Sequence, residues 1–179
     1  MLSTMRPLIC ATALLALAAC QTPVAQSTAG TATPAEVNFT TNAYQIIQFD
    51  REEGQLAQTQ AKMPRVKAIA QQLTAEADQF AAKLDPVAAG AGIKPPTELR
   101  NDLRVRLGHM RIQTGFDFDR TYLDDQIASH EEAIMMQDAM AGGAVSPAYA
   151  TLIRDGQATI KRNLDTLRSI RAQMGTNRR

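Results

Sequence analysis

One histidine and several neighbouring polar residues are the side chains of this sequence that could do chemistry. His130 lies in a segment, 117–141, whose apolar residues repeat with a helical period. At about 100° per residue, Asp119, Gln126 and Gln137 fall within roughly half a right angle of His130. The segment therefore predicts a column of polar side chains, with an imidazole in it, on the inward face of a helix.

Two interpretations of this column remain open. With Glu53 and Glu76 from two other predicted helices, His130 could form a degenerate carboxylate–histidine site that binds iron or another divalent metal weakly. Alternatively, the residues hydrogen-bond to one another, to Glu53 or to water in a network that fixes the helix register, because each unpaired buried polar group costs about 1–3 kcal/mol. The members of that network would be Asp119, Gln126, His130, Gln137 and Asn163.

The network interpretation is favoured, and no cofactor is expected. Di-iron bundles take a Glu-x-x-His motif from each of two helices, and the sequence contains no such motif. Catalysis is not expected either. The only histidines are His109 and His130, and neither a serine–histidine arrangement nor a glycine-rich phosphate loop is present. We therefore expect a non-catalytic protein that acts by binding or as structure.

The amino-acid composition indicates which classes of binding partner to expect. The 179 residues include 19 Lys and Arg against 18 Asp and Glu, and no basic stretch stands out. Nucleic acids are bound largely through Lys and Arg on phosphates, so a nucleic-acid partner is not expected. Three methionines of segment 117–141 (Met135, Met136 and Met140) could pack in the core or form a contact surface. A protein partner or self-association is therefore compatible with the sequence.

The N-terminal residues predict export and lipid anchoring. Arg6 precedes an apolar run over 7–19, which is too short to span a bilayer and is typical of a signal peptide. The run ends in Leu17-Ala18-Ala19-Cys20, which resembles the lipobox of bacterial lipoproteins. That resemblance implies that residues 1–19 are a lipoprotein signal peptide, that Cys20 is lipidated, and that the lipid anchors the protein in a membrane. Since Gln21, not aspartate, follows the cysteine, it also implies the periplasmic face of the outer membrane.

The rest of the chain predicts an all-α fold. Residues 20–37 hold the cysteine and a polar, proline-containing stretch that we interpret as a flexible tether. Residues 38–175 then predict a helical bundle. Its first helix is capped by Thr40, Thr41 or Asn42. Further helices follow from Pro64, after Thr97 until Gly115, over 117–141, and from Pro147 to about Met174. Short connections between long helices indicate an antiparallel four-helix bundle with one extra short helix, 97–114.

The segment FDFDRTY (116–122), followed by Gln126 and His130, resembles the signature F-D-x-x-Y-x-x-x-Q-x-x-x-H of an uncharacterised bacterial envelope family. Its members are ferritin-like helical bundles classed as a domain of unknown function, and the likeness covers about residues 39–172. The resemblance implies an acidic residue near Asp50 or Glu52 and a histidine at His130. Ala77 and Asn163 stand where the family has further histidines, so any inherited metal site would be degenerate.

Overall fold

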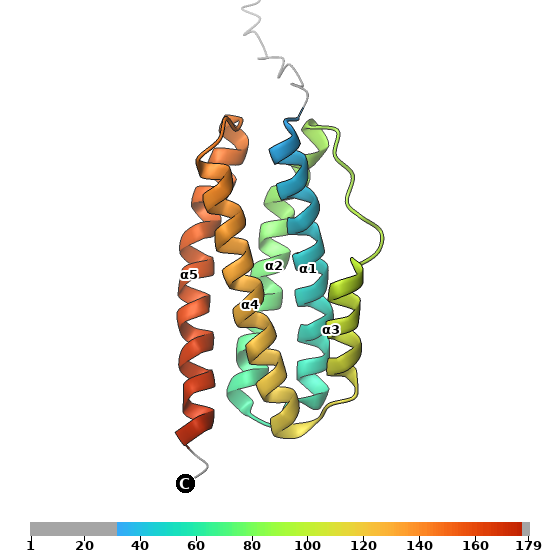
Figure 1. Ribbon diagram of the computed structural model, residues 1–179, viewed down its shortest axis with the longest axis vertical. Helices are drawn as coiled ribbons and strands as arrows, with labels where there is room; N and C mark the ends of the chain where they lie inside the picture. Colours follow the sequence, from blue (N-terminus) through green and yellow to red (C-terminus); the bar gives the residue numbers. More distant parts are fainter. Residues whose placement is uncertain (1–31, 177–179) are drawn as a thin grey trace, which may run out of the picture.

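The computed structural model describes residues 32–176, which form five α-helices and no strand (Figure 1). The all-helical fold predicted from the sequence is therefore confirmed. Residues 1–31, with the predicted signal peptide, Cys20 and most of the predicted tether, lie outside the described residues. The helices are α1 (Pro34–Gln60), α2 (Pro64–Gly90), α3 (Asn101–Arg111), α4 (Gly115–Ala141) and α5 (Pro147–Thr176).

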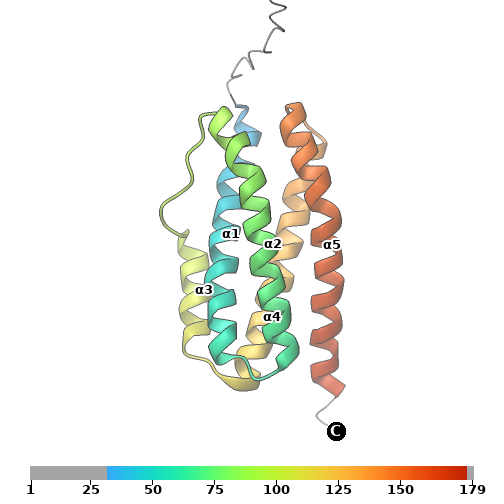
Figure 2. The same cartoon turned by 180° about the vertical axis from the view of Figure 1, so that it is seen from behind.

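Four long helices lie side by side, and the short α3 packs on the outside of this group (Figures 1 and 2). Helix α1 contacts α2 and α4, whereas α5 contacts α4 and α2. Helix α3 lies against α1 and α4, far from α5. The result is a helical bundle whose interior is bounded by α1, α2, α4 and α5.

The first helix begins earlier than the sequence pattern suggested. Thr33 and Glu36 form a capping box: Glu36 N donates to Thr33 Oγ1 (3.2 Å) and Thr33 N donates to Glu36 Oε2 (2.9 Å). Pro34 follows at the first helical position, where its fixed φ suits a helix start. The predicted caps at 40–42 are therefore wrong, and residues 34–37, assigned to the tether, are helical.

Glu36 also joins the start of α1 to the loop before α5. Its Oε1 accepts a hydrogen bond from Ser146 N at 2.8 Å. Burial alone would raise the pKa of Glu36, but the N–H groups of Ser146 and Thr33 outweigh it and lower the pKa. Nearby, the Thr40 hydroxyl lies 2.6 Å from the Tyr149 hydroxyl, so the predicted cap residue links α1 to α5 instead.

Gly115 starts a helix and does not end one. Helix α3 runs only from Asn101 to Arg111, and Gly115 is the first residue of α4. Its φ of +66° is a conformation that glycine adopts without a Cβ clash. This lets the chain turn sharply into α4 and form a bridge with Ala61 in the α1–α2 connection.

The α1–α2 contact depends on a second glycine. A Cβ built on Gly54 would lie 2.1 Å from Thr74 Oγ1. The missing side chain therefore lets α2 approach α1 closely beside the buried residues that follow. Towards the Gly115 end of the bundle the apolar core includes Leu73, Tyr122 and Leu123, and a second cluster fills the other end around Ile47, Leu84 and Tyr149.

Candidate functional site

Two carboxyl groups lie one turn apart on α1 inside the bundle. Asp50 and Glu53 are both buried, and one amide serves both. Gln126 Nε2 on α4 donates to Asp50 Oδ1 at 2.9 Å and to Glu53 Oε2 at 2.7 Å. The other oxygen of Glu53, Oε1, is buried and has no hydrogen-bond partner among the described residues.

Burial changes the protonation of this pair. It raises the pKa of Asp50, and the nearby His130 is the largest influence in the opposite direction. Burial also raises the pKa of Glu53 well above its ordinary value; the hydrogen bond from Gln126 opposes the shift, and Asp125 and Asp50 add to it. The interior therefore favours a neutral Glu53.

We expect the contribution of Glu53 to the free energy of unfolding to decrease as the pH rises. The folded state holds the Glu53 proton more tightly than the unfolded chain, whose pKa is about 4.5. The stabilising effect is thus complete below pH 4.5 and is lost as the pH rises through the raised folded pKa. Glu53→Gln, which removes the titratable group, should raise the free energy of unfolding at pH 8 by at least about 1 kcal/mol, because a pKa difference of one between the folded and unfolded states corresponds to about 1.4 kcal/mol.

Urea unfolding of the wild type and Glu53→Gln at pH 4, 6 and 8 measures this effect. Taking the difference between the two proteins cancels the opposite contribution of Glu36, which both contain. Equal differences at all three pH values would show that the Glu53 pKa is not raised in the folded state.

His130 is held by one ring nitrogen. Its Nδ1 lies 2.9 Å from the backbone oxygen of Gln126, and because a carbonyl only accepts, Nδ1 carries the proton. The opposite nitrogen, Nε2, makes no hydrogen bond within residues 32–176, and His130 lines a cavity. Nε2 is therefore available to a ligand in that cavity.

The five residues predicted to form one network lie in separate places. Gln126 and His130 are linked as described above. Asp119 accepts hydrogen bonds from the backbone N–H groups of Lys62 (3.0 Å) and Met63 (2.9 Å), so it holds the α1–α2 connection. Gln137 is buried, and its Oε1 has no partner in the described part of the chain.

Asn163 belongs to a cluster between α2 and α5. It donates to Glu76, and Arg162 Nη2 lies 3.3 Å from Glu76 Oε1. The proposed metal ligand Glu76 is therefore already paired, and it is not grouped with Glu53. Between residues 32 and 176, no three His, Cys, Asp or Glu side chains are close enough to share a metal ion. The donor set does not fit a metal held by His130, Glu53 and Glu76.

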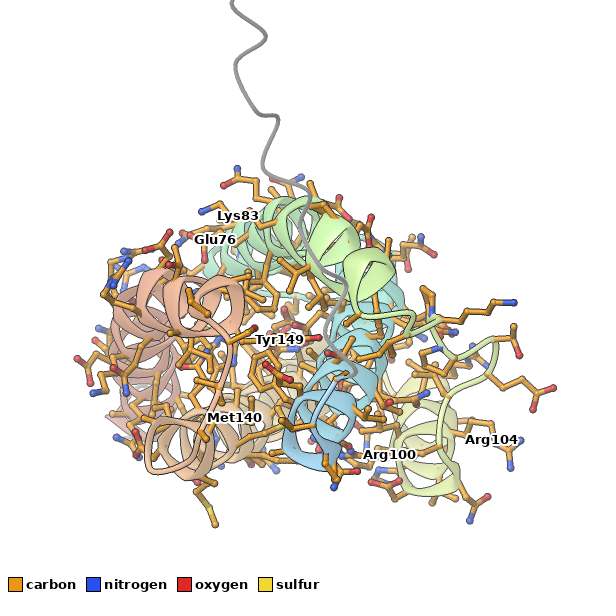
Figure 3. All side chains as sticks on the ribbon, turned by 90° about the horizontal axis from the view of Figure 1, so that it is seen from above. Glu76, Lys83, Arg100, Arg104, Met140 and Tyr149 are labelled. Carbon is orange, nitrogen blue, oxygen red and sulfur yellow. The ribbon has the colours of Figure 1, made fainter. Side chains whose placement is uncertain are left out.

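A cavity of about 220 Å³, here named the α2–α5 cavity, lies between the four long helices. Its walls are mainly apolar and include Ala43, Ile47, Ala77, Phe80, Ala133 and Leu152. Asp50, His130 and Gln137 also line it. Gln79, Lys83, Asp155 and Arg162 are exposed lining residues of α2 and α5, so the cavity opens between these helices. Figure 3 shows Glu76 and Lys83 on the flank of α2 nearer α5.

Sequence reasoning missed this cavity, although a signal was present. Ala77 and Gly156 occupy positions on the inward stripes of α2 and α5 where larger apolar side chains would fill the core. A Cβ on Gly156 would lie 3.2 Å from Gln137 Nε2 and 3.3 Å from Phe80. The glycine therefore lets Gln137 and Phe80 pack closely against α5, and the small side chain of Ala77 leaves space between the helices.

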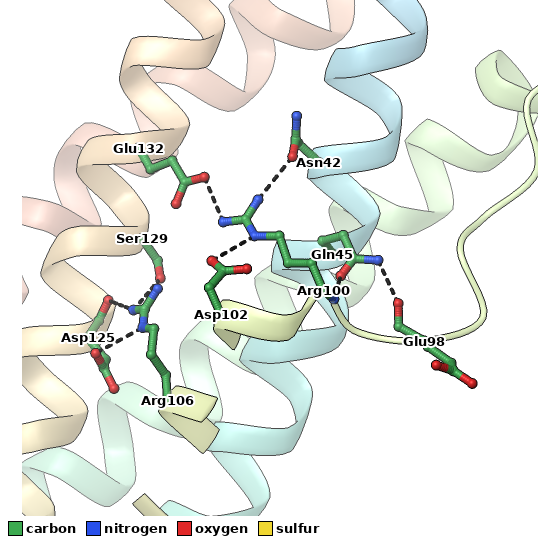
Figure 4. Close-up of polar contacts among 9 residues, drawn as sticks. All are labelled: Asn42, Gln45, Glu98, Arg100, Asp102, Arg106, Asp125, Ser129 and Glu132. Carbon is green, nitrogen blue, oxygen red and sulfur yellow. Dashed lines mark hydrogen bonds and ion pairs between the residues drawn. The ribbon is translucent and has the colours of Figure 1, made fainter. Parts of the chain in front are cut away.

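Two arginines that attach α3 to the bundle were also missed. Arg106 donates to Asp125 Oδ1 (3.1 Å) and Ser129 Oγ (3.2 Å) of α4 (Figure 4). Arg100 donates to Glu132 at 2.7 Å and Asn42 at 3.0 Å, so it joins α3 to both α4 and α1 (Figure 4). In the sequence these residues are recognisable only as positive charges, and a charged residue on a helix usually indicates a face exposed to solvent.

The fold and the site together define an all-helical bundle with a small, mainly apolar cavity, lined by a few polar groups, between its long helices. The chain belongs to the family described as a domain of unknown function (DUF4142), which matches residues 21–170. The predicted membership of an uncharacterised domain family is thus confirmed.

Among solved structures, the chain is similar to the crystal structure of a DUF305 fragment from Deinococcus radiodurans. The TM-score is 0.71 at 15% sequence identity, and the match covers 79% of this chain and 98% of that one. At this identity the likeness concerns the fold alone. No curated protein matches the chain.

Proposed function

We propose that this protein is a lipid-anchored binding protein of the bacterial envelope and that it binds a small molecule in the α2–α5 cavity without catalysis. The observation that carries this proposal is the cavity itself. It combines apolar walls with a few polar groups, which is the usual composition of a ligand site, and it lies between helices of a bundle, a common position for one.

The arrangement of the polar groups supports binding over catalysis. Ser129 Oγ accepts from Arg106, and His130 donates to a backbone carbonyl, so the two neighbouring side chains do not form a nucleophile–base pair. Helix directions support the further proposal that the bundle is a ferritin-like antiparallel four-helix arrangement. Helices α1 and α5 run one way, and α2 and α4 run the other (Figure 1).

The anchoring part of the proposal rests on the sequence that ends in Cys20. No helix within residues 32–176 is long and apolar enough to cross a bilayer. The family match starts at residue 21, directly after the cysteine. Two or more acyl chains on Cys20 would then be enough for stable attachment to the periplasmic face of the outer membrane.

We expect Cys20→Ser to release the protein from the membrane into the soluble periplasmic fraction, because the substituted residue cannot carry the lipid. Fractionation of cells that express the wild type or the variant, with immunodetection of the protein, measures the change. Cys10→Ser is the matched control and should leave the wild type distribution unchanged. A membrane-bound Cys20→Ser protein would contradict lipid anchoring.

Ligand binding in the α2–α5 cavity is tested by a thermal-shift screen of small neutral, anionic and cationic compounds. Compounds that bind should raise the melting temperature of the wild type but not of Ala77→Leu, whose larger side chain fills the cavity. Shifts that are equal in the two proteins would overturn the proposal. Stoichiometric metal in protein purified without chelator, lost in His130→Ala, would replace it with the metal-binding alternative.

A further inference from the structure

We infer that the ligand of the α2–α5 cavity is a small organic cation, a primary amine with a short apolar chain. This inference rests on the proposed binding function and adds the chemical class of the ligand. The ammonium group would lie between Asp50 and His130, the chain would follow the apolar walls, and the far end would reach Gln137.

The inner end of the cavity offers hydrogen-bond acceptors. Gln126 occupies Oδ1 of Asp50, and no donor among the described residues reaches the second oxygen of that carboxyl group. His130 uses Nδ1 as a donor to the backbone, which leaves Nε2 as an acceptor. Two acceptors side by side require a ligand with several N–H groups, and an ammonium group has three.

Charge favours a cation over an anion at this end. Asp50 is buried and lines the cavity, so a ligand carboxylate here would face the carboxyl group of Asp50 in a medium of low dielectric constant. A cation would instead stabilise the ionised form of Asp50. The charged residues at the opening of the cavity do not oppose the binding of a cation, because the positive charges of Lys83 and Arg162 are balanced by the negative charges of Glu76 and Asp155.

The middle of the cavity suits an alkyl chain. Ile47, Ala77, Phe80 and Ala133 line it with apolar surface. The volume of about 220 Å³ corresponds to about seven waters at the ~30 Å³ that each occupies in the liquid. It is below the ~300–1,000 Å³ of sites for drug-sized ligands, so the ligand must be small.

Gln137 provides a second polar contact in the cavity. Gln137 is 2% exposed, its Oε1 has no partner within the described residues, and it lines the cavity. It lies seven residues after His130 on α4, about 10.5 Å further along the helix at 1.5 Å per residue. An unpartnered buried amide at this distance is suited to a hydroxyl or similar group at the far end of a six-carbon chain.

The experiment compares three probes that share one alkyl chain: hexylamine, hexanol and hexanoate. Calorimetric titration uses the full-length protein in detergent, with the micelle alone as blank. We expect hexylamine to bind at least tenfold more tightly than the other two. Asp50→Asn should lose at least tenfold in hexylamine affinity, whereas the control Asp124→Asn, on the outer face of α4, should bind as the wild type does.

A further pair of measurements tests the contact with Gln137. Aminohexanol should bind the wild type more tightly than hexylamine, and this gain should disappear in Gln137→Leu. The selectivity of the wild type among the three probes does not depend on any variant folding. Circular dichroism and melting temperature establish that each variant is folded before its affinity is interpreted.

The outcomes separate the two proposals. Hexanol or hexanoate binding as tightly as hexylamine, with loss of binding in Ala77→Leu, would overturn the cation inference and leave the cavity as the binding site. Unchanged hexylamine affinity in folded Asp50→Asn would also overturn it. If no compound of the thermal-shift screen distinguishes the wild type from Ala77→Leu, the proposed binding function itself fails.

Discussion

Replacing Gln126 with leucine should lower the free energy of unfolding by about 3 kcal/mol. The side chain is fully buried, and its amide is the hydrogen-bond donor that Asp50 and Glu53 share. A hydrogen bond to a charged group such as the Asp50 carboxylate contributes about 1.5–3 kcal/mol, and a buried oxygen without a donor, such as that of neutral Glu53, costs about 1–3 kcal/mol. Leucine would remove both bonds and leave two carboxyl oxygens without a donor. Urea unfolding at pH 7 measures the loss.

Gln137→Leu is the matched control. Both glutamines are buried on α4, but Gln137 makes no hydrogen bond within residues 32–176. Its replacement by leucine should change the free energy of unfolding by less than about 1 kcal/mol, because no partner loses a bond. Equal destabilisation by the two substitutions would show that the hydrogen bonds of Gln126 are not what stabilises the carboxyl pair.

Phe49→Ala should destabilise the protein by about 3–5 kcal/mol, the range for removing a buried phenylalanine. The Phe49 side chain is fully buried in a cluster with Leu99, Leu103 and Leu107. The Arg106 guanidinium lies 4.8 Å from the centre of its ring. Since these contacts hold α3 against α1, hydrogen exchange should also show lower protection of the α3 amides in the variant.

Phe116→Ala provides the comparison for this prediction. Phe116 is 50% exposed and contacts Lys62, whose Nζ lies 4.5 Å from the ring centre. An exposed cation–π contact contributes about 0.5–1 kcal/mol, so this variant should lose no more than that. A similar loss in both variants would contradict the assignment of Phe49 as the residue that attaches α3.

The sequence predicts the first residue of some helices better than that of others. Pro64 and Pro147 mark the starts of α2 and α5, because proline at the first helical position is a local signal. The start of α1 was placed too late. Its N-cap is Thr33, which forms reciprocal hydrogen bonds with Glu36. Thr40, Thr41 and Asn42 are also residue types that are preferred at the N-cap, so residue type alone did not identify the correct position.

The candidate site shows the same limit. The helical period placed His130, Gln126 and Asp119 on an inward face, and all three are buried. Periodicity fixes the direction of a side chain around its own helix but not its height against the neighbouring helices. Asp119 therefore lies beside the α1–α2 connection, whereas Gln126 lies beside Asp50 and Glu53.

By itself the sequence determined that the described chain is helical and which faces of its helices point inward, because both follow from residues within one or two turns of each other. Only the tertiary structure decided which buried groups meet. The pairing of Gln126 with two carboxyl groups, the separation of Glu76 from Glu53, and the space beside Ala77 all depend on how the helices are aligned along the bundle. That alignment results from the packing of many side chains at once, and no single stretch of sequence specifies it.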